Sequence, residues 1–176
     1  MLMDEDAKPA EVHPEAPPPG TILPSHYDRC YGCGPQHRAG LRMRMTTGEG
    51  TTVSGQFEVT EEHQGAPGLA HGGLLACAMD EALGTLGWLL GIPSVTARLE
   101  SDFRLPVPVG TILHMHARCL GIAGRKIYLS ATARLNDPDG PIAVEAQALF
   151  LAVELTHFAR HGQPLDLDRE PTRINP

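Results

Sequence analysis

The chain has 176 residues with a net charge of −7, and hydrophobic residues make up 41% of it. This length is enough for one domain with a sizeable core. The acidic balance argues against general binding to nucleic acids or to anionic membranes. Four scattered cysteines are too few for a disulfide framework, so we expect free thiols in a reducing compartment and a cytoplasmic location.

Both ends of the chain differ in composition from its middle. Residues 1–25 are rich in proline and acidic side chains, which cannot form a packed core, so we expect a disordered or loosely draped arm. The first residues also lack the basic start and apolar stretch of a signal peptide. Residues 156–176 are polar and proline-flanked, and we expect a tail there. The folded domain is therefore predicted to span residues 26–155.

Residues 26–40, HYDRCYGCGPQHRAG, predict a compact loop rich in turns. Cys30 and Cys33 have the spacing of metal ligands, and His37 follows them. A structural zinc site needs four ligands, and one cysteine pair with one histidine is an incomplete set, to which His26 could add a fourth. We favour the simpler interpretation, a loop with two buried thiols, and expect no bound metal.

The stretch from His71 to Leu90 predicts one helix about 27 Å long. Its apolar residues recur at helical spacing and form one stripe: Leu75, Met79, Ala82, Leu83, Leu86 and Leu90. Small residues line the opposite side, so the helix should be buried. Asp80 and Glu81 lie at its centre, and two adjacent acids there argue against a membrane span. A buried carboxylate must be paired, exposed at a gap, or kept for chemistry.

Alternating polar and apolar residues predict six strands around this helix. Two precede it, at Leu41–Thr46 and Thr51–Thr60, and four follow it, at Val95–Leu105, Thr111–Leu120, Lys126–Leu135 and Ile142–Val153. The turn between Thr111–Leu120 and Lys126–Leu135 is expected at residues 121–124. The order β-β-α-β-β-β-β predicts an α+β fold, in which one long curved antiparallel sheet wraps around the central helix.

The helix and its flanks also resemble a known family. The segment HGGLLACAMDEALG, preceded by HQGAPGLA and followed by SVTARLESDFRLPVPVG, resembles the hotdog-fold acyl-CoA thioesterases. Within that superfamily it is similar to the small thioesterases of the phenylacetate pathway. The resemblance covers about residues 28–154. It implies hydrolysis of an acyl-CoA thioester without a cofactor, by a homodimer or a dimer of dimers with its active site at the interface.

The spacing along the helix agrees with an interface site. His71 and Asp80 are nine residues apart, which is half a turn out of register and about 13 Å along the axis. One helix cannot bring both residues to one substrate atom. Two antiparallel helices can, if each gives its N-terminus to Asp80 of the other.

The resemblance implies roles for six residues. Asp80 would act as general base or nucleophile. The amides of Gly72 and Gly73 are expected to be free donors at the helix start and would polarise the thioester carbonyl. His71 would orient the substrate or the loop, and the Thr96 hydroxyl would help to hold the water. Relatives often carry Asn six residues before the His, where this chain has Gly65. Gln64 is the nearest amide, and it would take the role of orienting the water or supporting the base.

Simpler alternatives stay open for these residues. Asp80 would be structural if it were paired with an arginine such as Arg98 or Arg104. Independently of Asp80, the two glycines would be structural if they only allowed a tight turn from the loop into the helix. A non-catalytic acyl-CoA-binding module and a hotdog hydratase or dehydratase are the alternative functions.

Coenzyme A carries phosphates, so an acidic protein that binds it needs local cations. Arg125 and Lys126 are adjacent in a predicted turn, and Arg98 and Arg104 share a predicted strand face with Thr96. We expect these four cations to bind the nucleotide, although each is also explained as a solvated surface charge.

Overall fold

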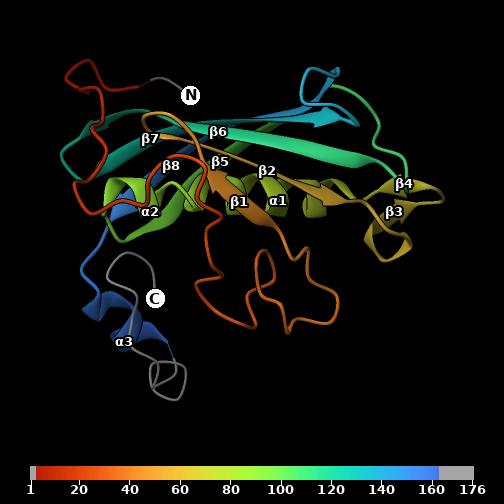
Figure 1. The fold of residues 1–176 in the computed structure, drawn as a ribbon, viewed down its shortest axis with the longest axis horizontal. Coiled ribbons are helices and arrows are strands. Elements are labelled where there is room, and N and C mark those ends of the chain that lie inside the picture. The colour runs from red at the N-terminus through yellow and green to blue at the C-terminus, as the bar shows by residue number, and fades with distance from the viewer. Residues whose placement is uncertain (1–2, 163–176) are drawn as a thin grey trace.

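The computed structural model describes residues 3–162, and one antiparallel sheet dominates it (Figure 1). Its six strands lie in the order β1-β2-β6-β7-β8-β5. Their bounds are β1 Arg44–Thr47, β2 Thr52–Glu58, β5 Ser94–Phe103, β6 Ile112–Ala123, β7 Lys126–Leu135 and β8 Ile142–Ala152. Helix α1, Gly72–Gly84, lies against one face of the long strands. The predicted α+β architecture, one antiparallel sheet packed on a helix, is therefore confirmed.

The predicted helix is divided in two. α1 ends at Gly84, and a second short helix, α2, spans Gly87–Leu90. Between them Leu86 N bonds to Leu83 O at 3.2 Å, an i−3 bond that tightens the turn. The Thr85 hydroxyl donates to Glu81 O at 2.7 Å, and threonine and glycine both lower helix stability. This turn creates the bend beside which the candidate site lies.

The apolar stripe of this helical segment packs as predicted. All six of its residues are buried, and the largest of them form the core together with side chains from β1, β2, β6 and β7. Residues 72–90 are long and apolar enough to cross a bilayer by length and composition alone. A buried core helix passes the same test, and α1 packs on five strands of the sheet.

The loop before α1 has more structure than the sequence indicated. It contains a single 3-10 turn, η1, at Glu61–His63, and a two-stranded hairpin of β3, Gln64–Ala66, and β4, Leu69–Ala70. His63 is buried, and its Nδ1 accepts a bond of 3.0 Å from Thr60 N. The sequence signal for this turn is a capping threonine three residues before a polar side chain. These contacts fix the direction from which the chain enters α1.

The N-terminal arm lies against the domain, where the sequence predicts a disordered or loosely draped segment. Lys8 forms an antiparallel bridge with Ile122 of β6, and Ile22 forms another with Thr46 of β1. Leu23 is 2% exposed and joins the hydrophobic core. Backbone bonds to a sheet edge and one buried leucine hold this proline-rich segment, whose composition alone would not fold. The arm thereby covers the β1 edge of the sheet.

The other end of the chain is described only in part. A short helix, α3, spans Thr156–His161 within the predicted tail. The rest of that predicted tail, residues 163–176, lies outside the described residues.

Candidate active site

Asp80 and Thr96 face each other across the space between α1 and β5. The Thr96 hydroxyl donates a hydrogen bond of 2.8 Å to Asp80 Oδ1. Burial raises the pKa of Asp80, and the Thr96 hydrogen bond opposes that rise. These two candidate residues, which are far apart in sequence, are thus in direct contact.

The arginine pairing that would make Asp80 structural is not found in the described part of the chain. Arg98 pairs with Glu100 at 2.6 Å, and Arg104 Nε pairs with Glu145 at 2.8 Å. Both arginines are more than half exposed. Their charges are therefore matched by exposed acids and do not compensate Asp80.

A β-bulge places the side chains of Thr96 and Arg98 on opposite faces of the sheet. Thr96 pairs with Phe150, but Arg98 pairs with Leu149, so Ala97 is the extra residue. Phe150 is buried on the helix side of β8, and its neighbour Leu149 faces the other way. The prediction that Thr96 and Arg98 share a face is therefore wrong. The bulge turns Thr96 toward Asp80 and leaves Arg98 on the outer face.

A cavity of about 320 Å³ opens at this contact. Asp80 and Thr96 line it together with Trp88 of α2 and with apolar side chains, among them Met43, Met45 and Phe150. The chain before β1 supplies the remaining wall, including His26, Cys30 and Cys33. A carboxylate with a raised pKa thus sits in a concave, half-apolar space of the kind that small ligands occupy.

The start of α1 is capped by its own histidine. His71 is the N-cap residue, and its Nδ1 accepts a hydrogen bond of 2.9 Å from Gly73 N. The prediction that both glycine amides are free donors is therefore wrong for Gly73. The Gly72 amide has no acceptor among the described residues, as the first turn of a helix leaves it. One of the two predicted donors remains available at the positive end of the helix.

Gly65 is explained by its contact with this cap. A Cβ at residue 65 would lie 2.8 Å from both Cα and Cδ2 of His71. The hairpin therefore packs so tightly on His71 that an asparagine does not fit at this position. The side chain of Gln64 also does not replace it, because it is committed to the loop. Its Oε1 accepts from Gly68 N at 2.6 Å, and its Nε2 donates to Glu61 O at 2.9 Å.

Nothing in the sequence indicated that His63 contacts the residue that caps α1. Its carbonyl accepts a bond of 2.8 Å from His71 N, so it supports the capping residue directly. Burial lowers the pKa of the His63 imidazole, which favours the neutral ring that accepts from Thr60 N. His63 therefore positions the helix start and does not face the cavity.

The cations predicted for coenzyme A are separated by the fold. Arg98 and Arg104 lie on the outer sheet face, while Arg125 and Lys126 lie at the turn between β6 and β7. That turn is residues 124–125 and not 121–124, because a bulge near Cys119 lets β6 continue to Ala123. Lys126 Nζ pairs with Asp4 of the arm at 2.8 Å.

Arg125 instead lies beside a group that the sequence did not suggest. It lines a cleft of about 850 Å³ together with His157, Arg160 and His161 of α3. This cleft adjoins the Asp80 cavity, since Ile92 lines both. The sequence predicts a polar tail at these three residues and offers no reason to place them near Arg125.

Comparison with known proteins shows what the centre of the chain is similar to. Residues 67–142 match the model of the thioesterase superfamily. The acyl-coenzyme A thioesterase THEM4 of Xenopus laevis is 34% identical over 88 residues, which make up 50% of this chain and 39% of that protein. THEM4 of Bos taurus is 35% identical over 91 residues, which make up 52% of this chain and 37% of that protein. The chain thus matches well under half the length of these relatives.

Solved structures agree with the fold. A thioesterase superfamily protein has a TM-score of 0.66 at 25% identity, over 78% of this chain and 70% of its own. Zebrafish thioesterase superfamily member 2 has a TM-score of 0.62 at 16% identity, over 72% of this chain and 93% of its own. The domain has the hotdog fold of these thioesterases, and the resemblance to that superfamily is confirmed. The narrower likeness to the phenylacetate-pathway enzymes stays a prediction.

Proposed function

We propose that this protein hydrolyses an acyl-CoA thioester to a free acid and coenzyme A. The observation that carries the proposal is the Asp80–Thr96 hydrogen bond at the wall of a half-apolar cavity. The names of the THEM4 relatives support the substrate class. Two solved structures with the same fold are complexes, one with coenzyme A and one with acetyl CoA.

In the proposed reaction Asp80 activates the hydrolytic water as a general base. Thr96 holds the carboxylate through Oδ1, which leaves Oδ2 for the water. Attack at the thioester carbon places negative charge on the carbonyl oxygen. A free amide at a helix N-terminus stabilises such an oxyanion, and Gly72 carries one. A covalent variant, with Asp80 as nucleophile, uses the same groups.

The two halves of this machinery lie at different points of one helix. Asp80 follows Gly72 by eight residues on α1, which corresponds to about 12 Å along the axis. We therefore propose a two-fold dimer in which Gly72 of one subunit serves Asp80 of the other. An assembly of two such dimers contains the same site.

The sheet edges support this mode of association. The arm covers β1, but β5 is the opposite edge strand and has ten residues with no described strand on its outer side. Natural proteins seldom leave so long an edge unpaired. Phe103 at the end of β5 is 52% exposed and lies beside Gly72, where a Cβ would be 3.7 Å from its ring. A second copy placed along β5 would cover both the edge and this aromatic side chain.

Substitution of Asp80 tests the proposal. Asp80→Asn keeps the shape and removes the base, so turnover of acyl-CoA should fall at least about 100-fold. The measurement is release of the coenzyme A thiol from a panel of acyl-CoAs that differ in chain length and aromaticity. Asp102→Asn, on the exposed outer face of β5, is the matched control and should keep wild-type turnover.

The panel also separates hydrolysis from binding. Tight binding of acyl-CoA by the wild-type protein without thiol release would show that it is a binding module and not an enzyme. Near-wild-type turnover of Asp80→Asn would remove this residue from the mechanism.

A further inference from the structure

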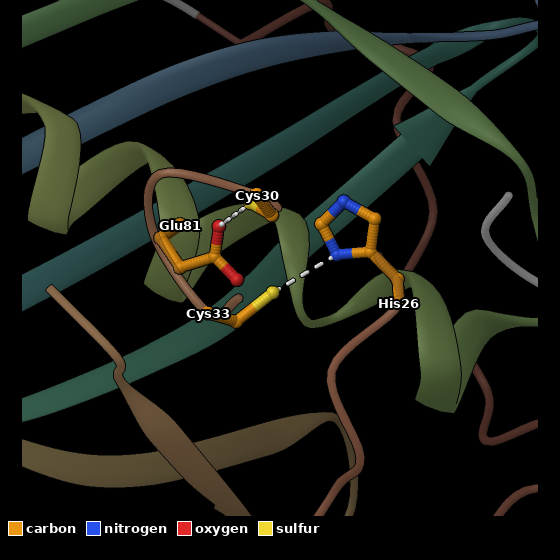
Figure 2. Close-up of side chains that lie close together, drawn as sticks. All are labelled: His26, Cys30, Cys33 and Glu81. Carbon is orange, nitrogen blue, oxygen red and sulfur yellow. Dashed lines mark hydrogen bonds between the residues drawn. The ribbon is translucent and has the colours of Figure 1, made fainter. Parts of the chain in front are cut away.

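Four side chains that bind metals converge beside the cavity: His26, Cys30, Cys33 and Glu81 (Figure 2). One ligand atom from each lies within 4.8 Å of those of the other three. Cys33 Sγ lies 3.2 Å from His26 Nδ1, and Cys30 Sγ lies 3.5 Å from Glu81 Oε2. Three of the residues come from the loop before β1 and the fourth from α1, 48 positions beyond Cys33 in the sequence.

The loop is built to hold this arrangement. Gly34 N bonds to Cys30 O at 2.9 Å, which closes the turn around the two cysteines. Met43 N bonds to Gly32 O at 2.9 Å, and the Arg44 guanidinium donates to Cys33 O, so the turn is fastened to β1. A Cβ at Gly32 would overlap the Glu81 carboxylate. Glycine at this position therefore lets the loop approach the acid on α1 directly.

The distances suit a tetrahedral ion. Zinc bonds of about 2.0–2.3 Å place tetrahedral ligands roughly 3.3–3.8 Å apart. The two measured contacts, 3.2 and 3.5 Å, fall at or near that spacing. Ligand atoms that lie up to 4.8 Å apart need to approach by roughly 1–1.5 Å at most to reach this spacing, which side-chain rotation supplies. The His26 ring presents Nδ1 to Cys33, in the direction from which an ion would be bound (Figure 2).

Charge gives a second and independent reason. Glu81 is only partly accessible, and its carboxylate makes no ion pair within residues 3–162. Its neighbours in the cluster are two thiols and an imidazole, and the thiol of Cys30 is a weak donor. Buried charges are normally paired or coordinate metals. Two thiolates, one imidazole and one carboxylate form a donor set that suits zinc.

We propose that His26, Cys30, Cys33 and Glu81 together bind one zinc ion. Four protein ligands close the coordination sphere, so the site is structural and leaves no open position for substrate. The sequence predicts two buried thiols and no metal, because one cysteine pair and one histidine form an incomplete ligand set. The fold completes the set with Glu81 and not with His37, which packs edge-on against Tyr31 at 4.9 Å.

The ion would fasten the N-terminal loop to the helix that carries Asp80. Glu81 is the next residue, and the loop and Asp80 line one cavity. The zinc would therefore fix a wall of the proposed active site and hold α1 and β1 in a constant position relative to each other. The binding site itself does not depend on the thioesterase proposal.

Metal content of the purified full chain tests the site. The untagged protein, purified without chelators, should contain one zinc per chain by elemental analysis. After removal of the zinc, titration with cobalt should produce thiolate-to-cobalt charge-transfer absorption and the intense visible bands of a tetrahedral site. Cys30→Ser and Glu81→Gln should each weaken binding by about 10-fold or more. Cys119→Ser, a partly buried cysteine on β6, is the matched control and should retain full stoichiometry.

The outcomes are separable from those for catalysis. Wild-type protein with no zinc and no cobalt spectrum would overturn the proposal, whatever its hydrolytic activity. A Cys30–Cys33 disulfide in the freshly purified chain, seen as a mass loss of two hydrogens, would also overturn it in favour of a redox pair. Zinc retained by a hydrolytically inactive protein would refute the thioesterase alone. If a variant fails to fold, the wild-type stoichiometry and cobalt spectrum still decide.

Discussion

Thr96 and Asp80 are 16 residues apart in sequence and joined by a hydrogen bond of 2.8 Å. The bulge at Ala97 makes this contact possible, because it gives Thr96 and Arg98 opposite faces of β5. Glu81, one step around α1 from Asp80, faces the Cys30 thiol instead. Two adjacent acids on one helix thus serve a proposed catalytic group and a proposed metal site.

Replacement of Thr96 should expose its positioning role. Thr96→Val keeps the shape and removes the donor, so kcat should fall about 10- to 100-fold, as expected for a hydrogen bond to a charged group of about 1.5–3 kcal/mol. KM should change little, because the hydroxyl is placed to hold the base and not the substrate. Steady-state kinetics on acyl-CoA measure both.

Two further variants complete this test. Thr96→Ser restores the hydroxyl and should recover most of kcat. Thr132→Val, on the outer side of β7, should behave as wild type. If KM and kcat changed together in Thr96→Val, or if serine gave no rescue, Thr96 would not act by holding the carboxylate.

The arm prediction concerns two neighbouring residues with opposite exposure. Leu23 is 2% exposed and Ile22 is 67% exposed. Leu23→Ala should lower the free energy of unfolding by about 2–4 kcal/mol, because it leaves a cavity in the core. Ile22→Ala should change it by no more than about 0.5 kcal/mol. Denaturant titration of both variants measures this difference, and equal small effects would mean that the arm does not pack in solution.

The sequence predicted the parts of the fold that depend on local periodicity. The buried stripe that runs through α1 and α2 and the alternation in the six strands are repeated patterns, and the strands lie close to their predicted bounds. The Asp80 site was reached through resemblance, and its contact with Thr96 needed the fold. Long-range pairing leaves no such repeat in the chain.

The errors share this physical origin. A bulge at Ala97 inserts one residue and changes the face of all that follows, which residue type does not reveal. Leu23 is one apolar residue in a polar arm, and its burial depends on a core pocket that the local sequence does not indicate. The proposed ligand Glu81 lies 48 residues beyond Cys33, where no motif spacing would point.

The cleft lined by Arg125 and α3 predicts how the nucleotide is bound. Arg125→Ala should raise KM for acyl-CoA and leave kcat nearly unchanged, because phosphate contacts are the same in the ground and transition states. Added salt should raise the wild-type KM in the same way, since exposed phosphate contacts are screened over about 8 Å at physiological ionic strength. Arg160→Ala should copy Arg125→Ala, because both line the same cleft.

Lys126 provides the comparison within the turn. Its ammonium group pairs with Asp4, so Lys126→Ala should raise KM less than Arg125→Ala. A truncated thioester that lacks the nucleotide should be hydrolysed equally by all of these variants. Equal losses on the truncated and full substrates would show that Arg125 supports the fold, through its bond to Ala152 O, and not the nucleotide.

The proposed dimer, in which Gly72 of one subunit serves Asp80 of the other, can be tested by substitution of Gly72. Gly72→Pro removes one amide donor while keeping the helix, because proline is tolerated at the first helical position and His71 already has an extended backbone with ψ 131°. Turnover should fall about 10²- to 10³-fold, as for loss of an oxyanion donor. Gly72→Ala retains the amide, and an added Cβ meets only ordinary contacts with Phe103, so this control should stay active.

Mixing then distinguishes a shared site from one contained in each chain. Gly72→Pro and Asp80→Asn chains, unfolded together and refolded, should form heterodimers with one fully intact site each. Random association makes half of the dimers mixed, so about a quarter of wild-type activity should return. Mass analysis of differently tagged chains confirms that mixing occurred. Heterodimers that form but stay inactive would show that Gly72 and Asp80 do not meet across the interface, and a fully active monomer in solution scattering would refute the dimer itself.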